Sequence, residues 1–245
     1  MVRIPEWNRA SGVALGRILM VMEPKPSARS TSGAIQLSLV AASLLDLATS
    51  NALSLTDRAP SSAVLAFQFL DRWATPTALV ASGIAGLAWI AGSRRTLLRL
   101  LDLSLALALV ALVVNLVGLV ACLFDKQDNP GFLLLSASLV YLENIAVFAS
   151  FYWRFDHAHR EREGDGSAPH PGVVFPQDTA AFHTLKGWKP GFVDYLFLSF
   201  NTASTFGPTL PVPLRAPVQL GMMLQVLVAM AVLVMLAARA VGMIG

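Results

Sequence analysis

Five stretches of this chain are long and apolar enough to cross a lipid bilayer, and they constrain the fold more than any motif does. A bilayer core of about 30 Å requires about 20 apolar residues in a helix. Windows of that length with at most one charged residue occur at residues 32–55, 73–93, 100–124, 130–153 and 216–238. Because unpaired backbone groups are costly in lipid, each window is expected to form a transmembrane helix. The sequence therefore predicts an all-α integral membrane protein with about five transmembrane helices.

The composition agrees with this class and excludes several others. Hydrophobic residues make up 55% of the chain and charged residues only 13%, whereas soluble domains carry about 25% charged residues. The net charge of +3 is small, so nucleic acid is not an expected partner. Cys122 is the only cysteine, which excludes a disulfide within the chain and argues against a cysteine-ligated metal site. The expected partner is the lipid bilayer, with no cofactor and no bound metal.

A shorter apolar run lies at residues 191–206, just before the last window. As a helix it would reach about 24 Å, which is short of a full crossing. Pro190 suits the first turn of a helix, and Asp194 interacts favourably with its N-terminal dipole. A segment rich in Gly and Pro follows at residues 207–213. These features predict a short re-entrant, pore-type helix before the final transmembrane helix, although a full crossing remains an alternative.

The chain divides into four predicted regions. These are a cytoplasmic or interfacial N-terminal tail (1–31), a four-helix transmembrane region (32–153), a polar loop (154–189), and a pore-loop-like segment with the final transmembrane helix (190–245). Most of the 18 Lys and Arg residues lie in the tail, in the polar loop and between the second and third windows. The positive-inside rule therefore predicts a cytoplasmic N-terminus.

The C-terminal third carries a family resemblance. An apolar helix there ends in Phe151-Tyr152-Trp153-Arg154, and residues 172–176, residues 191–202 and a long final helix follow. This order resembles a family of bacterial multi-pass membrane proteins that has no assigned activity, which implies the bacterial inner membrane. Residues 190–245 are also similar, more distantly, to the pore loop and inner helix of two-transmembrane potassium channels.

The comparison with potassium channels also predicts a difference in selectivity. The residues that lie over the channel filter are Thr202, Ser204, Thr205, Phe206, Gly207, Pro208 and Thr209. Pro208 and Thr209 replace the tyrosine and second glycine of the filter, and proline cannot adopt the backbone conformation that aims filter carbonyls at an ion. We expect a channel-like frame that is not potassium-selective and that forms a homo-oligomer if it is a pore. Alternatively, the hydroxyl groups only satisfy the broken backbone.

Polar side chains inside the apolar windows form a second set of candidates. Glu143 and Asn144 lie in the middle of the fourth window, Asp46 in the first and Gln225 in the last. A charge at the bilayer centre costs about 2.5–3.5 kcal/mol, so such residues usually serve a purpose. Two interpretations remain open for the carboxylates, which are helix pairing through hydrogen bonds and a path for a proton or monovalent cation.

Three functional hypotheses follow from these patterns. The first is an ion-channel-like or transport-related membrane protein. The second is a non-conducting membrane scaffold or partner protein that retains a pore-type fold. The third is a membrane enzyme, which is least favoured because no phosphate-binding loop, nucleophile elbow or zinc-binding helix motif occurs and no catalytic residue can be named.

Overall fold

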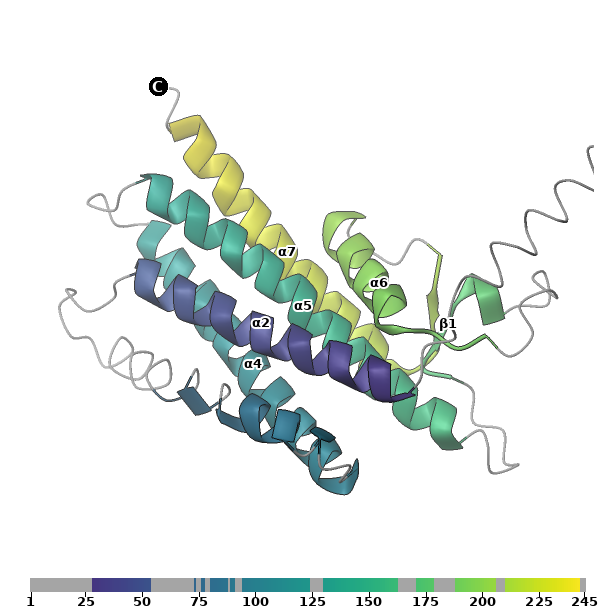
Figure 1. The fold of residues 1–245 in the computed structure, drawn as a ribbon. Coiled ribbons are helices and arrows are strands. Elements are labelled where there is room, and N and C mark those ends of the chain that lie inside the picture. The colour runs from purple at the N-terminus through teal and green to yellow at the C-terminus, as the bar shows by residue number, and fades with distance from the viewer. Residues whose placement is uncertain are drawn as a thin grey trace, which may run out of the picture.

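The computed structural model describes residues 28–53, 73, 76–77, 80–87, 89–90, 94–123, 130–162, 171–178, 188–205 and 210–242. Its helices are α2 (Ala28–Leu53), α4 (Arg94–Leu123), α5 (Pro130–Arg162), α6 (Phe192–Thr205) and α7 (Ala216–Gly242), shown in Figure 1. Three of them contain stretches long and apolar enough to cross a membrane, namely Arg95–Val120, Leu133–Arg160 and Ala216–Ala238. The predicted helical class is confirmed, and the three apolar helices are compatible with a membrane protein.

The number of spans stays a prediction. In α2, the apolar stretch among the described residues is Gly33–Thr49, which is shorter than the other three. The predicted window at residues 73–93 lies only in part among the described residues. The count of about five therefore rests on the apolar windows of the sequence.

Helix α5 is the centre of the bundle, because it packs against α2, α4, α6 and α7. Arg154 of α5 forms an ion pair with Asp102 in the first part of α4, and Asn115 further along α4 bonds to Glu143, earlier in α5. The two helices are therefore antiparallel. Helix α5 also runs to Arg162, beyond the predicted end of the span at residue 153, because its last turns find polar partners described below.

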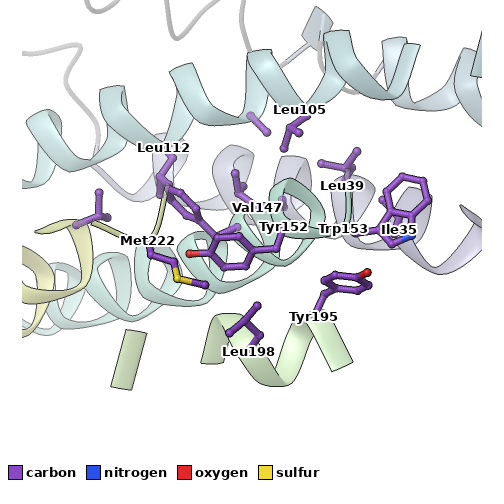
Figure 2. Close-up of a cluster of buried hydrophobic side chains, with 14 of the residues drawn as sticks. Ile35, Leu39, Leu105, Leu112, Val147, Tyr152, Trp153, Tyr195, Leu198 and Met222 are labelled. Atoms are coloured by element: carbon purple, nitrogen blue, oxygen red, sulfur yellow. The ribbon is translucent and has the colours of Figure 1, made fainter. Parts of the chain in front are cut away.

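The core extends across the five helices α2, α4, α5, α6 and α7 of the described residues. Figure 2 shows Leu39 of α2, Leu112 of α4, Tyr152 of α5, Leu198 of α6 and Met222 of α7 in one buried cluster. Lipid tails are as apolar as these side chains, so tight packing rather than exclusion of water favours their association in a membrane.

Gly221 allows α7 to approach α5 closely. A Cβ atom added at Gly221 would clash with the ring of Phe151, whose Cζ lies 3.0 Å from that position. Small residues at helix contacts are typical of membrane proteins, because they bring two backbones together. The larger core side chains of α5 and α7 pack beside this contact.

The segments on both sides of α6 meet at the end of the bundle where α5 ends (Figure 1). Helix α6 begins there with a cap in which the Gly191 N–H donates to Asp194 Oδ2 at 2.7 Å, as in a capping box. Strand β1 (Val173–Val174) pairs antiparallel with β2 (Val212–Pro213), directly before α7. Within the described residues, this two-stranded pairing and the 3₁₀ helix η3 (Pro176–Asp178) are the only regular elements that are not α-helical.

Candidate functional site

Two carboxylates and one amide from three different helices meet inside the bundle. The Asn115 Nδ2 group on α4 donates to Asp46 Oδ1 on α2 at 2.7 Å and to Glu143 Oε2 on α5 at 3.0 Å. The exposed fractions are 2% for Asp46, 3% for Asn115 and 0% for Glu143. We call these three residues the carboxylate–amide triad. Two of the intramembrane residues named from sequence are thus brought together.

The electrostatics of the triad are unusual for a buried site. Both carboxylates lie within hydrogen-bond distance of one nitrogen, so they are close neighbours, and ionisation of both would produce strong repulsion. The bridging donor is a neutral amide. Among the side chains that the structure describes, no Lys or Arg is fully buried. An arrangement of this kind can bind a proton or a small cation that reduces the repulsion.

A second, uncharged cluster lies on another side of α5. Gln225 of α7 donates through Nε2 to the hydroxyl of Ser199 on α6 at 2.7 Å and accepts from the Tyr152 hydroxyl at 2.5 Å. Asn144 Nδ2 donates to the Gln225 backbone oxygen at 3.4 Å. Successive helical residues point about 100° apart, so Asn144 lies on a different face of α5 from Glu143. This cluster joins α5, α6 and α7.

The predicted pore-loop residues are only partly described. Thr202 is buried and donates to the Leu198 carbonyl at 2.8 Å. Ser204 and Thr205 are exposed and donate to carbonyls of the preceding turn, those of Phe200 at 2.8 Å and Asn201 at 2.6 Å. The remaining candidates, Phe206, Gly207, Pro208 and Thr209, lie outside the described residues. The described hydroxyls thus bond to the backbone of their own helix.

A charged cluster at the end of α5 joins the elements around α6. Asp156 is 0% exposed and accepts hydrogen bonds from the Val173 N–H at 3.0 Å, the Tyr195 hydroxyl at 2.6 Å and Arg160 Nε at 2.6 Å. Arg160 also forms two hydrogen bonds with Asp178 of η3, at 3.0 and 2.7 Å. We call Asp156, Arg160, Asp178 and Tyr195 the end cluster.

The environment of Tyr195 follows from this geometry. Burial raises the pKa of the Tyr195 phenol above its ordinary value of 10.0, and the negative charge of Asp156 raises this pKa further. The phenol therefore stays protonated and donates its hydrogen bond to Asp156 at neutral pH. The end cluster fixes the first turns of α6 against α5.

Several of these residues were not singled out from the sequence. Asn115 lies within the third apolar window. Its side chain is uncharged, so it differs less from its apolar neighbours than Asp46 or Glu143 does. Its position in the window was the available signal, because an amide in lipid also needs a partner. Asp156 and Arg160 lie in the predicted polar loop, where charged residues are common and do not by themselves indicate a site. Among the described residues, no group of three or more His, Cys, Asp or Glu residues could hold a metal ion.

Comparison with known proteins assigns no family and no function to this chain. No protein-family model, no curated protein and no solved structure matches the chain.

Proposed function

We propose that this chain is a transport-related protein of a bacterial inner membrane that carries a monovalent cation or a proton through its helical bundle. The observation that carries the proposal is the bridge of Asn115 Nδ2 between Asp46 and Glu143. Carboxylates inside a membrane protein are costly and typically mark ion pathways or proton relays. The triad is the ion site in this proposal.

The triad favours transport over a purely structural role. Two helices can be paired through neutral amide or hydroxyl groups, as Gln225 and Ser199 pair α7 with α6. Two carboxylates around one amide add electrostatic repulsion that helix pairing does not require. A proton or cation bound between the two carboxylates would lower this repulsion. A non-conducting scaffold, the alternative, has no need of the second carboxylate.

Helix α6 is re-entrant in this proposal. Tyr195 in the first turns of α6 bonds to Asp156 near the end of α5. Strand β2, which follows α6 in the chain, pairs with β1 at the same end of the bundle. Arg95, Arg99 and Arg215 lie near the ends of α4 and α7 that share this side of the bundle with the end of α5. Their positive charge supports a cytoplasmic N-terminus and entry of α6 from the cytoplasmic side.

The ion path runs within one chain. The three triad residues come from α2, α4 and α5 of the same molecule, so the site does not depend on a homo-oligomer. A pore formed by α6 would instead require several copies around an axis. Selectivity for potassium is not expected, because Pro208 and Thr209 stand where a potassium filter has tyrosine and glycine.

Ion flux in reconstituted vesicles tests this proposal. Purified protein in liposomes is given separate H⁺, Na⁺ and K⁺ gradients, and flux is followed with ion-sensitive dyes. We expect flux of at least one ion. Glu143→Gln and Asp46→Asn should each lower that flux by about tenfold or more, because each removes a carboxylate from the path.

Asp102→Asn is the matched control. Asp102 pairs with Arg154 near the end of the bundle and its side chain is 47% exposed, so the same chemical change there should leave flux unaltered. Size-exclusion chromatography verifies that all variants remain folded. A folded wild-type protein that conducts none of the three ions would contradict the proposal and favour the scaffold alternative.

A further inference from the structure

We propose that Gln225 is a positioning residue for the triad and that it acts through one turn of α5, residues 143–146. The inference rests on the proposed function and deepens it. We call residues 143–146 the central turn. The central turn carries Glu143 of the triad, and each of its four residues forms a hydrogen bond with a different helix of the bundle.

The contacts of the central turn reach α4, α7, α6 and α2, in that order along α5. They have lengths of 3.0, 3.4, 2.7 and 3.2 Å and join Asn115 to Glu143, Asn144 to the Gln225 backbone oxygen, Ser199 to the Ile145 carbonyl and Ser38 to the Ala146 carbonyl. Successive residues of a helix point about 100° apart and rise by about 1.5 Å, so these four contacts surround α5 within about 5 Å along its axis. The central turn is therefore held on all sides at one level of the bundle.

Two of the four contacts are made to the backbone of α5. The carbonyls of Ile145 and Ala146 accept from the hydroxyls of Ser199 and Ser38. A carbonyl oxygen has two lone pairs, so it can accept such a bond beside the one within its own helix. A side chain can rotate to follow a moving partner, whereas a backbone carbonyl moves with its helix. A shift of α6 or α2 against α5 therefore acts directly on the turn that carries Glu143.

Gln225 connects the central turn to both α6 and α7. Its side chain is 0% exposed. The Gln225 Nε2 group donates to the Oγ and the backbone oxygen of Ser199, at 2.7 and 3.0 Å, and its Oε1 atom accepts from the Tyr152 hydroxyl. Ser199 in turn donates to the Ile145 carbonyl. Two routes thus lead from Gln225 to the central turn, one through Asn144 and one through Ser199.

The other members of the triad lie on different helices from these contacts. Asp46 belongs to α2 and Asn115 to α4, whereas Gln225 and Ser199 hold α5 from α7 and α6. A shift of the central turn therefore changes the position of the Glu143 carboxyl relative to the other two triad residues. The affinity of the triad for an ion depends on that position. By reciprocity, an ion bound at the triad changes the contacts of α5 with α6 and α7.

A purely structural role for Gln225 leads to a different expectation. In that role, the residue would hold α6 and α7 against α5 and would leave the triad unaffected. Substitutions at Gln225 and in the triad would then act independently, and their effects on the unfolding equilibrium constant would multiply to within about twofold. In the positioning role, the effect of one substitution depends on the presence of the other.

A double-mutant cycle between Gln225→Met and Asn115→Leu tests the inference without any flux measurement. Each substitution replaces a buried amide with an apolar side chain of similar size. Unfolding in mixed micelles is measured for the wild type, the two single variants and the double variant. We expect the effect of Asn115→Leu on the unfolding equilibrium constant to change by more than about twofold when Gln225→Met is present. A cycle that is additive to within that factor would overturn the proposal.

Gln219→Met is the matched control on α7. Gln219 is exposed, and its Nε2 group donates to the Pro213 backbone oxygen at 3.2 Å. The same chemical change there leaves the contacts of the central turn in place, so its cycle with Asn115→Leu should be additive. Equal departures from additivity in the Gln219 and Gln225 cycles would also overturn the proposal.

Ser199→Ala is the second variant, which serves if Gln225→Met does not fold. It removes a single hydroxyl group, the one that joins Gln225 to the Ile145 carbonyl. Its cycle with Asn115→Leu should depart from additivity in the same way. Ser204→Ala is the control on α6, because Ser204 is exposed and donates to a carbonyl of its own helix at 2.8 Å.

Flux measurements give a second readout, which a structural role would not change. In a protein that carries an ion, Gln225→Met should change the ion concentration for half-maximal flux by about threefold or more, whereas Gln219→Met should not. A coupled cycle in a protein that conducts none of the three ions contradicts the proposed transport and leaves the coupling of Gln225 to the triad standing. In a conducting protein, an additive cycle or an unchanged half-maximal concentration overturns the inference and leaves the transport standing.

Discussion

The triad and the end cluster have the same layout with opposite electrostatics. In each, one nitrogen-bearing side chain bridges two carboxylates: Arg160 lies between Asp156 and Asp178, and Asn115 lies between Asp46 and Glu143. The guanidinium compensates the charge of its neighbours, whereas the amide compensates none.

This difference separates a structural role from an ion-binding role. A buried carboxylate with a guanidinium, a phenol and a backbone N–H as donors is fully satisfied in one state, and it holds elements in place. Carboxylates that share a neutral donor remain responsive to an added positive charge. The end cluster accordingly fixes α6 and β1 to α5, and the triad is the ion site of the proposed function. The same carboxyl-to-amide substitution should therefore have opposite consequences in the two places.

The largest effect on stability is expected for Asp156→Asn in the end cluster. The substitution removes the negative charge that pairs with Arg160. It also replaces one carboxylate oxygen, which accepts hydrogen bonds, with an NH₂ group, which cannot accept them. We therefore expect a loss of about 3–5 kcal/mol in the free energy of unfolding. Reversible unfolding in mixed micelles measures this quantity. The control is Asp102→Asn, which breaks a partly exposed ion pair and should cost at most about 1 kcal/mol. Equal losses in the two variants would contradict the structural role of the end cluster.

Tyr195→Phe should have an intermediate effect that depends on pH. The variant loses the hydrogen bond from the phenol to Asp156, which corresponds to about 2 kcal/mol for a bond to a charged acceptor. The pKa of Tyr195 is raised in the folded protein, so its contribution to stability is complete below the ordinary pKa of 10.0 and declines as pH rises above that value.

The pH dependence gives the Tyr195 prediction its specific signature. The difference in unfolding free energy between wild type and Tyr195→Phe should be largest near neutral pH and should shrink above pH 10.0. Unfolding curves collected on both sides of that value test this expectation. A difference that stays constant into the alkaline range would mean that the phenol is not coupled to Asp156 as its 2.6 Å distance indicates.

The two regions also differ in how far the sequence predicts them. The last helix follows from apolar length alone: the window at residues 216–238 lies within α7 (Ala216–Gly242). Asp46 and Glu143 are charged residues within apolar windows, so two of the three triad residues can be predicted from the sequence. Their connection through Asn115 depends on how three helices pack, which no local pattern contains.

The end cluster could not be predicted from the sequence, for a different reason. Charged residues after Trp153 are typical of a polar loop, and residues 154–189 were expected to be one. The structure continues α5 to Arg162 because Asp156 and Arg160 find partners on β1, η3 and α6. Those partners lie 13 to 39 positions away along the chain, so only the tertiary structure reveals that the charges are satisfied.

The smallest effect on stability is expected for Glu143→Gln in the triad, and this result is the sharpest test of the comparison. The glutamine oxygen can still accept from Asn115, and the change removes one of two neighbouring carboxylates, so the free energy of unfolding should change by less than about 1 kcal/mol in either direction. The same unfolding assay in mixed micelles, with Asp156→Asn beside it, measures the contrast. If Glu143→Gln destabilises the protein as strongly as Asp156→Asn does, the carboxylate of Glu143 is a structural group like that of Asp156. The distinction between a neutral and a cationic bridge would then have no functional meaning. If stability is retained while ion flux is lost, the carboxyl group of Glu143 serves the proposed transport and not the fold.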